Sequence, residues 1–143
     1  MPFKFSSRSQ QKLKTCHQDL QLIAHESLKR SDIDFGIVEG HRSLQRQQLL
    51  YQAQRSRIDG VSKKGKHNYQ PSLALDIVAY VNGKISYRES YLAYLGGVFT
   101  STARYLLEEK FIQHRLRWGG NWDGDGEIIT DQSFLDMPHF ELC

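Results

Sequence analysis

The most constraining feature of the sequence is an apolar run at residues 73–80 that carries a single carboxylate, Asp76. Pro71 precedes the run and the pair Asn82-Gly83 follows it. An apolar run between a proline and an Asn-Gly pair is typical of a β-strand that ends in a hairpin turn. Burying a carboxylate in such a strand costs free energy unless a cationic group binds it. We therefore expect Asp76 to have a positively charged partner.

Two histidines are placed to approach this carboxylate. His67 precedes Asp76 by nine residues, and Pro71 disfavours a helix between them, so the chain can fold back and bring the two side chains together. Near the C-terminus, His139 follows Asp136 by three residues at the start of a short segment that alternates polar and apolar residues, as a strand does. His67, Asp76 and His139 would give a zinc ion three ligands and leave its fourth position to water, which is typical of a catalytic site.

These motifs resemble those of a family of zinc peptidases. The similarity is to the D-alanyl-D-alanine carboxypeptidase (VanY-like) superfamily, and within it to the L-alanyl-D-glutamate endopeptidases that bacteriophages use as endolysins. It is carried by Lys66-His67, Ala74-Leu75-Asp76-Ile77, Trp118-Gly119-Gly120 and Asp136-x-x-His139. Gly65 stands where the family pattern has serine, and the loop between His67 and Asp76 is longer here. Because loop insertions cost little free energy, we interpret the chain as a variant of this family.

The resemblance implies an α+β fold in which a small antiparallel sheet carries the zinc site and packs against several helices, as in hedgehog and D-alanyl-D-alanine peptidase domains. It implies a single catalytic domain at residues 1–143. The implied function is zinc-dependent cleavage of the L-alanyl-D-glutamate bond in the peptide stem of bacterial peptidoglycan, as a phage endolysin in host cell lysis. In the family, the acid three residues before the last histidine is the general base, which makes Asp136 the expected catalytic residue.

An arginine follows another predicted strand, which lies earlier in the sequence. The apolar run at residues 35–39 ends just before Gly40-His41-Arg42, where an arginine could bind a carboxylate in a bidentate manner or pair with a nearby acid. The resemblance assigns to this position an arginine that faces the substrate, so Arg42 is the candidate for binding a substrate carboxylate. Gln48 is a second candidate for facing the site, although a solvated glutamine is the simpler interpretation.

Helices are expected from capping residues and from the spacing of apolar residues, at residues 6–14, 17–29, 43–57 and 90–113. Gly96-Gly97 interrupts the last of these and is expected to permit close packing or a kink. Three histidines in or beside the helices are weak candidates for metal binding. His17 and His25 are expected at the surface or in ordinary hydrogen bonds, and His114 has no carboxylate at ligand spacing in the sequence.

A second group of possible metal ligands follows Trp118. Asn121, Asp123 and Asp125, followed by Gly126, match the first half of an EF-hand calcium loop. The twelfth position, where a bidentate glutamate is expected, is Gln132, so the match is incomplete. The sequence therefore predicts either a low-affinity calcium site near the active site or a plain acidic turn.

Composition limits the remaining possibilities. The chain has 143 residues, of which 39% are hydrophobic and 24% charged, as in one globular domain. No run approaches the roughly 20 apolar residues of a membrane span, so membrane insertion is not expected. The N-terminus lacks an apolar signal core, and Cys16 and Cys143 form no Cys-x-x-Cys motif. We expect a monomer with reduced thiols that accumulates in the host cytoplasm and reaches the periplasm and cell wall through a separate pore.

Three alternatives remain open. A D-alanyl-D-alanine carboxypeptidase or dipeptidase on the same scaffold is the nearest, although an aspartate rather than a glutamate at position 136 favours the endopeptidase. A zinc-binding module without catalysis is the second, and the presence of Asp136 argues against it. The third is a small basic nucleic-acid binder, but a net charge of +3 is only a mild bias. The sequence also lacks a helix-turn-helix signal or an aromatic and basic platform, so nucleic acid is not an expected partner.

Overall fold

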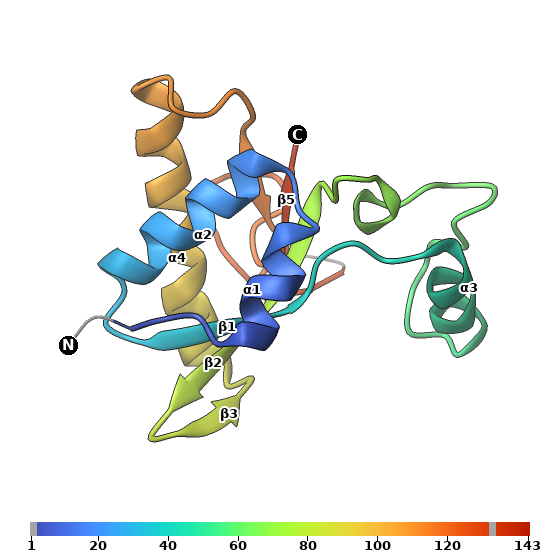
Figure 1. Ribbon diagram of the computed structural model, residues 1–143, viewed down its shortest axis with the longest axis horizontal. Helices are drawn as coiled ribbons and strands as arrows, with labels where there is room; N and C mark the ends of the chain where they lie inside the picture. Colours follow the sequence, from blue (N-terminus) through green and yellow to red (C-terminus); the bar gives the residue numbers. More distant parts are fainter. Residues whose placement is uncertain (1–2, 132–133) are drawn as a thin grey trace.

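An antiparallel sheet lies at the centre of the structure, a computed structural model that describes residues 3–131 and 134–143 (Figure 1). The strand order is β1-β2-β5-β4, and β3 pairs with the C-terminal end of β2. The strands have the following bounds: β1 Asp34–Glu39, β2 Ala74–Val81, β3 Lys84–Ser86, β4 Leu116–Trp118 and β5 His139–Leu142. All of these pairings are antiparallel, which together with the helices confirms the predicted α+β fold.

Helices α1 (Ser7–Lys14), α2 (Gln18–Arg30) and α4 (Glu89–Glu108) enclose the hydrophobic core together with the sheet (Figure 1). The side chains of Leu75 and Ile77 lie in this core. Because neighbouring residues of a strand point to opposite faces, Asp76 projects from the other face of the sheet. The predicted hairpin after β2 is also present, since Asn82 and Gly83 have φ angles of 53° and 74°, as a two-residue hairpin turn of type I′ requires.

Two helices are shorter than the sequence predicts. Helix α3 (Leu44–Gln52) was expected to continue to residue 57, but Gln54 has a left-handed φ of 60°, a conformation that ends helices. In the same way, α4 was expected to reach residue 113 and ends at Glu108, shortly before Lys110 with a φ of 65°. Helix α3 and the loop that follows it project from the rest of the molecule (Figure 1).

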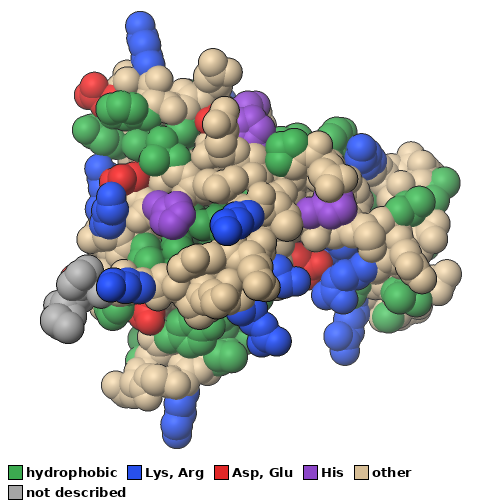
Figure 2. Space-filling view, in the orientation of Figure 1, with side chains coloured by type: hydrophobic (Ala, Val, Ile, Leu, Met, Phe, Trp, Pro, Cys, Tyr) green, Lys and Arg blue, Asp and Glu red, His purple; other side chains and the backbone are tan. Residues whose placement is uncertain are grey.

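Within the described residues, no helix is long and apolar enough to cross a membrane. Lys and Arg side chains are spread over the face of the molecule shown in Figure 2. Both cysteines are free thiols: Cys16 is buried and Cys143 is exposed.

Candidate metal centre

Three separate segments bring His67, Asp76 and His139 together. Asp76 on β2 and His139 on β5 are directly paired across the sheet, and His67 lies in a short 3-10 turn, η1 (Lys66–Asn68). The Oδ1 atom of Asp76 lies 3.1 Å from His139 Nδ1 and 3.4 Å from His67 Nε2, and the two ring nitrogens are 3.3 Å apart. The structure thus unites the three side chains that the sequence indicates as zinc ligands.

The spacing of these donor atoms suits a tetrahedral zinc ion. Zinc binds nitrogen and carboxylate oxygen at about 2.0–2.1 Å, and ligands of a regular tetrahedron of that size are about 3.3 Å apart. The three observed separations, 3.1, 3.3 and 3.4 Å, fall around this value. Two imidazoles and one carboxylate also match the donor types that zinc prefers. The site therefore fits zinc in both chemistry and dimensions.

Neighbouring groups fix the orientation of both rings. His67 Nδ1 lies 2.8 Å from the carbonyl oxygen of Gly40, which can only accept a hydrogen bond, so Nδ1 donates and Nε2 points to the centre. On the other ring, His139 Nε2 lies 2.9 Å from Glu141 Oε1 and donates to it, which leaves Nδ1 facing Asp76. Glu141 is held in turn by Arg117 Nη2 at 2.6 Å. Partners of this kind orient metal-binding histidines and raise their basicity.

The electrostatics of the centre favour a cation. Burial alone would raise the pKa of Asp76, but hydrogen bonds and charges from His139 and His67 outweigh it and hold that pKa well below its usual range. Burial would lower the pKa of His139, yet the hydrogen bonds to Asp76 and Glu141 raise it to about 9. Asp76 therefore has cationic partners, as its place in an apolar strand predicts: His139, and Arg42 with its Nη2 3.8 Å away. Positive charge is stabilised between the two carboxylates.

Asp136 borders this centre from the segment before β5. Its Oδ2 lies 4.0 Å from His139 Nδ1, and 38% of its side chain is exposed, against 10% for His139. Burial and the charge of Asp76 raise its pKa, although His139, His67 and Arg42 act in the opposite direction. A carboxylate that combines solvent access, proximity to the donors and a raised pKa is suited to accepting a proton.

The Trp118-Gly119-Gly120 motif explains how Asp136 is placed. A Cβ atom on Gly119 would lie 1.9 Å from the carbonyl oxygen of Asp136, so only glycine permits this approach. The backbone N–H of Asp136 donates to the carbonyl oxygen of Gly119 at 3.1 Å. The indole of Trp118 is buried and donates to the carbonyl oxygen of Met137 at 2.7 Å. Trp118 therefore packs in the core, whereas the ring of Trp122 lies beside His139, with centroids 5.6 Å apart.

Arg42 lies at the edge of the centre in a network of side chains. Its Nη2 is 3.8 Å from Asp76 Oδ2, while Nε donates to Glu39 and Nη1 donates to Gln47, both at 2.9 Å. A bulge in β1 lies just before Glu39, which pairs across the sheet with Asp76. Gln47, rather than the neighbouring Gln48, is the glutamine that reaches the site. Sequence reasoning missed it because a single glutamine in a polar helix gives no signal of burial.

The acidic loop contains a group of carboxylates that only partly matches the predicted calcium ligands. Asp123 and Asp125 lie together with Asp131, which the sequence analysis did not select. Asn121 Nδ2 donates to the carbonyl oxygen of Asp125 at 2.9 Å, and Asn121 Oδ1 is buried with no hydrogen-bond partner among the described residues. The expected twelfth position, Gln132, lies outside the described residues.

A second cluster contains His17 and His114. His114 has no carboxylate at ligand spacing in the sequence, but in the structure its Nδ1 lies 2.8 Å from Asp19 Oδ2. His17 caps α2 by accepting the backbone N–H of Asp19 at 3.0 Å, and the three side chains form a separate group of possible metal ligands. The sequence separation of 95 residues between Asp19 and His114 concealed this contact. His25, the third weak candidate for metal binding, lies outside this cluster and packs edge-on against Phe5.

The whole chain is similar to known peptidases. Residues 1–143 match the family model described as Phage L-alanyl-D-glutamate peptidase. The L-alanyl-D-glutamate peptidase of Escherichia phage T5 is 28% identical over 147 residues, which cover 99% of each chain. The crystal structure of the Serratia marcescens L-Ala D-Glu endopeptidase ChiX matches with a TM-score of 0.78 and 27% identity, over 99% of this chain and 91% of that one. The chain therefore belongs to the family of phage L-alanyl-D-glutamate peptidases.

Proposed function

We propose that this protein is a zinc-dependent endopeptidase that cleaves the L-alanyl-D-glutamate bond in the peptide stem of bacterial peptidoglycan. The observation that carries the proposal is the convergence of three donor atoms within 3.4 Å of one another, with the carboxylate of Asp136 at their exposed side. Membership of the L-alanyl-D-glutamate peptidase family supports this choice of the bond that is cleaved. The convergence of donors beside an accessible carboxylate supports a hydrolytic site rather than a purely structural metal site.

We assign the following roles to the residues of the centre. His67, Asp76 and His139 would hold the zinc ion, which when bound acts as a Lewis acid and lowers the pKa of a water ligand to about 7. Asp136 accepts the proton of the attacking water and delivers it to the leaving amine, as general base and then general acid. Glu141 and the carbonyl oxygen of Gly40 keep the two imidazoles in the tautomers that the centre requires.

The test is a digest of purified muropeptides by the zinc-loaded protein, with the products identified by mass. Cleavage between L-alanine and D-glutamate is expected, and release of free D-alanine would instead support the carboxypeptidase alternative. Asp136→Asn should retain stoichiometric zinc and lose hydrolysis, because the amide cannot accept the water proton. If Asp136→Asn is as active as the wild type, this role for Asp136 is wrong. If neither protein cleaves any muropeptide, a zinc-binding module without catalysis becomes the better description.

We propose that Arg42 binds the free carboxylate of the D-glutamyl residue. Its Nη2 faces the centre while Glu39 and Gln47 fix the rest of the guanidinium, so a carboxylate can approach without reorganising the side chain. The test compares stem peptides in which this carboxylate is free or amidated. The wild type should prefer the free acid, and Arg42→Lys should lose most of that preference. An unchanged preference in Arg42→Lys would rule out this contact, whatever the effect on overall stability.

We also propose that the acidic loop binds calcium, with Asp123, Asp125 and Asp131 as carboxylate ligands and Asn121 beside them. The ligand atoms of the three aspartates lie within 4.8 Å of one another. Trp122 lies in the same loop and next to His139, so an ordered loop would fix one wall of the active site. Adding calcium to zinc-loaded, calcium-free protein should raise the melting temperature or the activity, and Asp123→Asn should reduce that response. No response to calcium in either measurement would leave the loop as a plain acidic turn.

The biological role that we propose is that of an endolysin which reaches the cell wall through a separate pore. The family of phage peptidases to which the chain belongs supports this role. Expression in a susceptible host should leave the culture intact, and co-expression of a pore-forming phage protein should cause lysis. Lysis without the pore protein would show another route to the wall. An absence of lysis with the pore, despite activity on isolated wall, would show that the cleavage is not lytic.

A further inference from the structure

The cluster of His17, Asp19 and His114 is built from elements that carry none of the proposed zinc ligands. His17 and Asp19 lie at the start of α2, and His114 lies in the connection between α4 and β4, which passes next to this end of α2 (Figure 1). Each side chain offers one donor atom, and the three donors lie within 4.8 Å of one another. The centroids of the two imidazole rings are 4.8 Å apart at an interplanar angle of 74°.

A buried carboxylate lies beside two partly exposed imidazole rings. The side chain of Asp19 is 10% exposed, and its Oδ2 accepts hydrogen bonds from the backbone N–H of Gln113 at 2.9 Å and from His114 Nδ1 at 2.8 Å. The side chains of His17 and His114 are 25% and 35% exposed. His17 Nδ1 lies 4.0 Å from Asp19 Oδ1. His114 Nδ1 already lies beside Asp19 Oδ2, at 2.8 Å. Rotation of the partly exposed His17 ring, which breaks the hydrogen bond that its Nδ1 accepts from the backbone N–H of Asp19, would bring a nitrogen of that ring onto a cation at Asp19.

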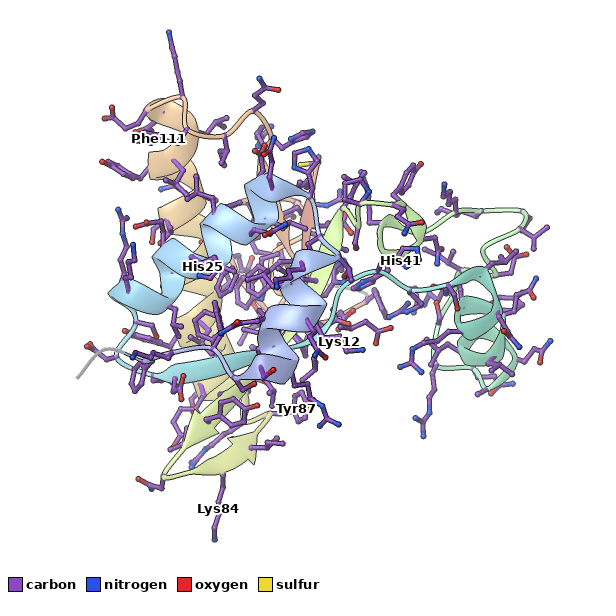
Figure 3. All side chains as sticks on the ribbon, in the orientation of Figure 1. Lys12, His25, His41, Lys84, Tyr87 and Phe111 are labelled. Atoms are coloured by element: carbon purple, nitrogen blue, oxygen red, sulfur yellow. The ribbon has the colours of Figure 1, made fainter. Side chains whose placement is uncertain are left out.

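The space beside the cluster is open to solvent. A cavity of about 410 Å³ is lined by residues of both elements, including His17, Asp19, Lys110, Phe111 and Gln113. Phe111 is labelled on the connection after α4 in Figure 3. This volume provides room for water molecules, which a metal with three protein ligands needs to complete its coordination. Calcium and magnesium take oxygen ligands, so two imidazoles in the cluster disfavour them.

We propose that His17, Asp19 and His114 form a second metal site, which binds a divalent transition metal of the zinc, nickel or copper type. A site with two imidazoles and one carboxylate suits these metals better than it suits hard cations. His17 Nδ1 lies 4.0 Å from Asp19 Oδ1, whereas the donors of the first site lie within 3.4 Å of one another. The second site must contract to bind, so it fills after the first. A metal there links the start of α2 to the connection between α4 and β4 and stabilises the fold.

The test is a titration of zinc alone into metal-free, full-length protein, followed by calorimetry and by NMR of the imidazole nitrogens. Two binding steps are expected. The signals of His67 and His139 should change in the first step, and those of His17 and His114 in the second. The second step should also raise the melting temperature. His17→Gln and His114→Gln should each lose the second step and keep the first.

Matched controls exclude adventitious binding of zinc. His25→Gln removes a histidine from the same helix, at a position that Figure 3 labels, without touching the cluster. Cys143→Ser removes the exposed thiol. Both variants should keep both steps. The inference is overturned if the signals of His17 and His114 do not change as zinc is added, or if the second step survives in His17→Gln and in His114→Gln. If a variant is misfolded, the assignment of the imidazole signals in the wild type still decides the question. A missing first step would instead count against the proposed catalytic site.

Discussion

Gln47 is a residue whose importance becomes visible only in the structure. Its side chain is 1% exposed, and it makes hydrogen bonds in three directions. Nε2 donates to Ser56 Oγ at 2.8 Å and to the carbonyl oxygen of Ile58 at 2.6 Å, while Oε1 accepts from Arg42 Nη1 at 2.9 Å. Gln47 thus connects the projecting loop after α3 to the arginine beside Asp76.

Replacing Gln47 by alanine should lower both stability and activity. The substitution removes the hydrogen bonds that Gln47 makes to Ser56, to the carbonyl oxygen of Ile58 and to Arg42 Nη1, and each such bond contributes about 0.5–1.5 kcal/mol. Gln48→Ala is the matched control, and an isolated surface change of this kind is expected to alter stability by less than about 0.5 kcal/mol. Urea unfolding and muropeptide hydrolysis provide the measurements. Equal effects of the two substitutions would show that Gln47 has no special role.

At the scale of secondary structure, the two glycines of α4 differ although the sequence treats them as a pair. A Cβ on Gly96 would lie 2.4 Å from the indole of Trp118, so Gly96 permits α4 to pack against β4. A Cβ on Gly97 would have no atom within 4 Å. The expectation of close packing at Gly96-Gly97 is therefore correct for Gly96 and has no basis at Gly97.

The pair allows an experiment in which each variant controls for the other. Gly97→Ala should stabilise the protein by up to about 1 kcal/mol, because alanine favours the helix more than glycine does. Gly96→Ala gains the same helix propensity but must displace the buried indole of Trp118, and overpacking of a core costs about 1–3 kcal/mol. The free energy of unfolding in urea should therefore rise in one variant and fall in the other. A shift of the same sign in both would contradict this account of α4.

The elements of the sheet show how far the sequence alone could reach. The strands at residues 35–39 and 73–80 were predictable because each is an apolar run with clear boundaries, and the observed bounds differ by one residue at the ends. The pairing of β5 between β2 and β4 was not predictable, since β5 is four residues long and pairing is a long-range property. The ends of α3 and α4 depend on left-handed residues, Gln54 and Lys110, whose types do not require that conformation.

At the scale of the whole molecule, the site was more predictable than its surroundings. The motifs that contain His67, Asp76 and His139 have residue types and spacings that metal chemistry restricts. The resemblance to the family could therefore predict a role for each of these residues. The cluster around His114 has no such motif, because its carboxylate comes from a distant helix. Contacts that depend on how helices pack, rather than on local spacing, were therefore missed.

Acid should destabilise the molecule through carboxylates that are paired in the folded state. Burial opposes the ionisation of Glu39, but hydrogen bonds and charges from Arg46 and Arg42 outweigh it and hold the pKa below the usual 4.5. In the same way, His139 and Arg117 lower the pKa of Glu141 to about 2 against the effect of burial. A group with a lowered pKa stabilises the fold above its unfolded pKa and loses that contribution as protons bind to the folded state. Stability should therefore fall progressively below about pH 4.5.

This pH dependence can be assigned to Glu39 with one matched pair of variants. Melting temperatures are measured from pH 7 to pH 3 in metal-free protein, so that release of metal in acid does not contribute. Glu39→Gln should melt at a lower temperature than the wild type at pH 7, because the ion pairs with Arg42 and Arg46 are lost, and its curve should be flatter below pH 4.5. Glu26→Gln removes a carboxylate that pairs with Lys29 at the surface, 3.2 Å away, and such pairs contribute little. Its curve should follow the wild type. If Glu39→Gln keeps the slope of the wild type, the acid sensitivity arises elsewhere, and Glu141 becomes the group to replace next.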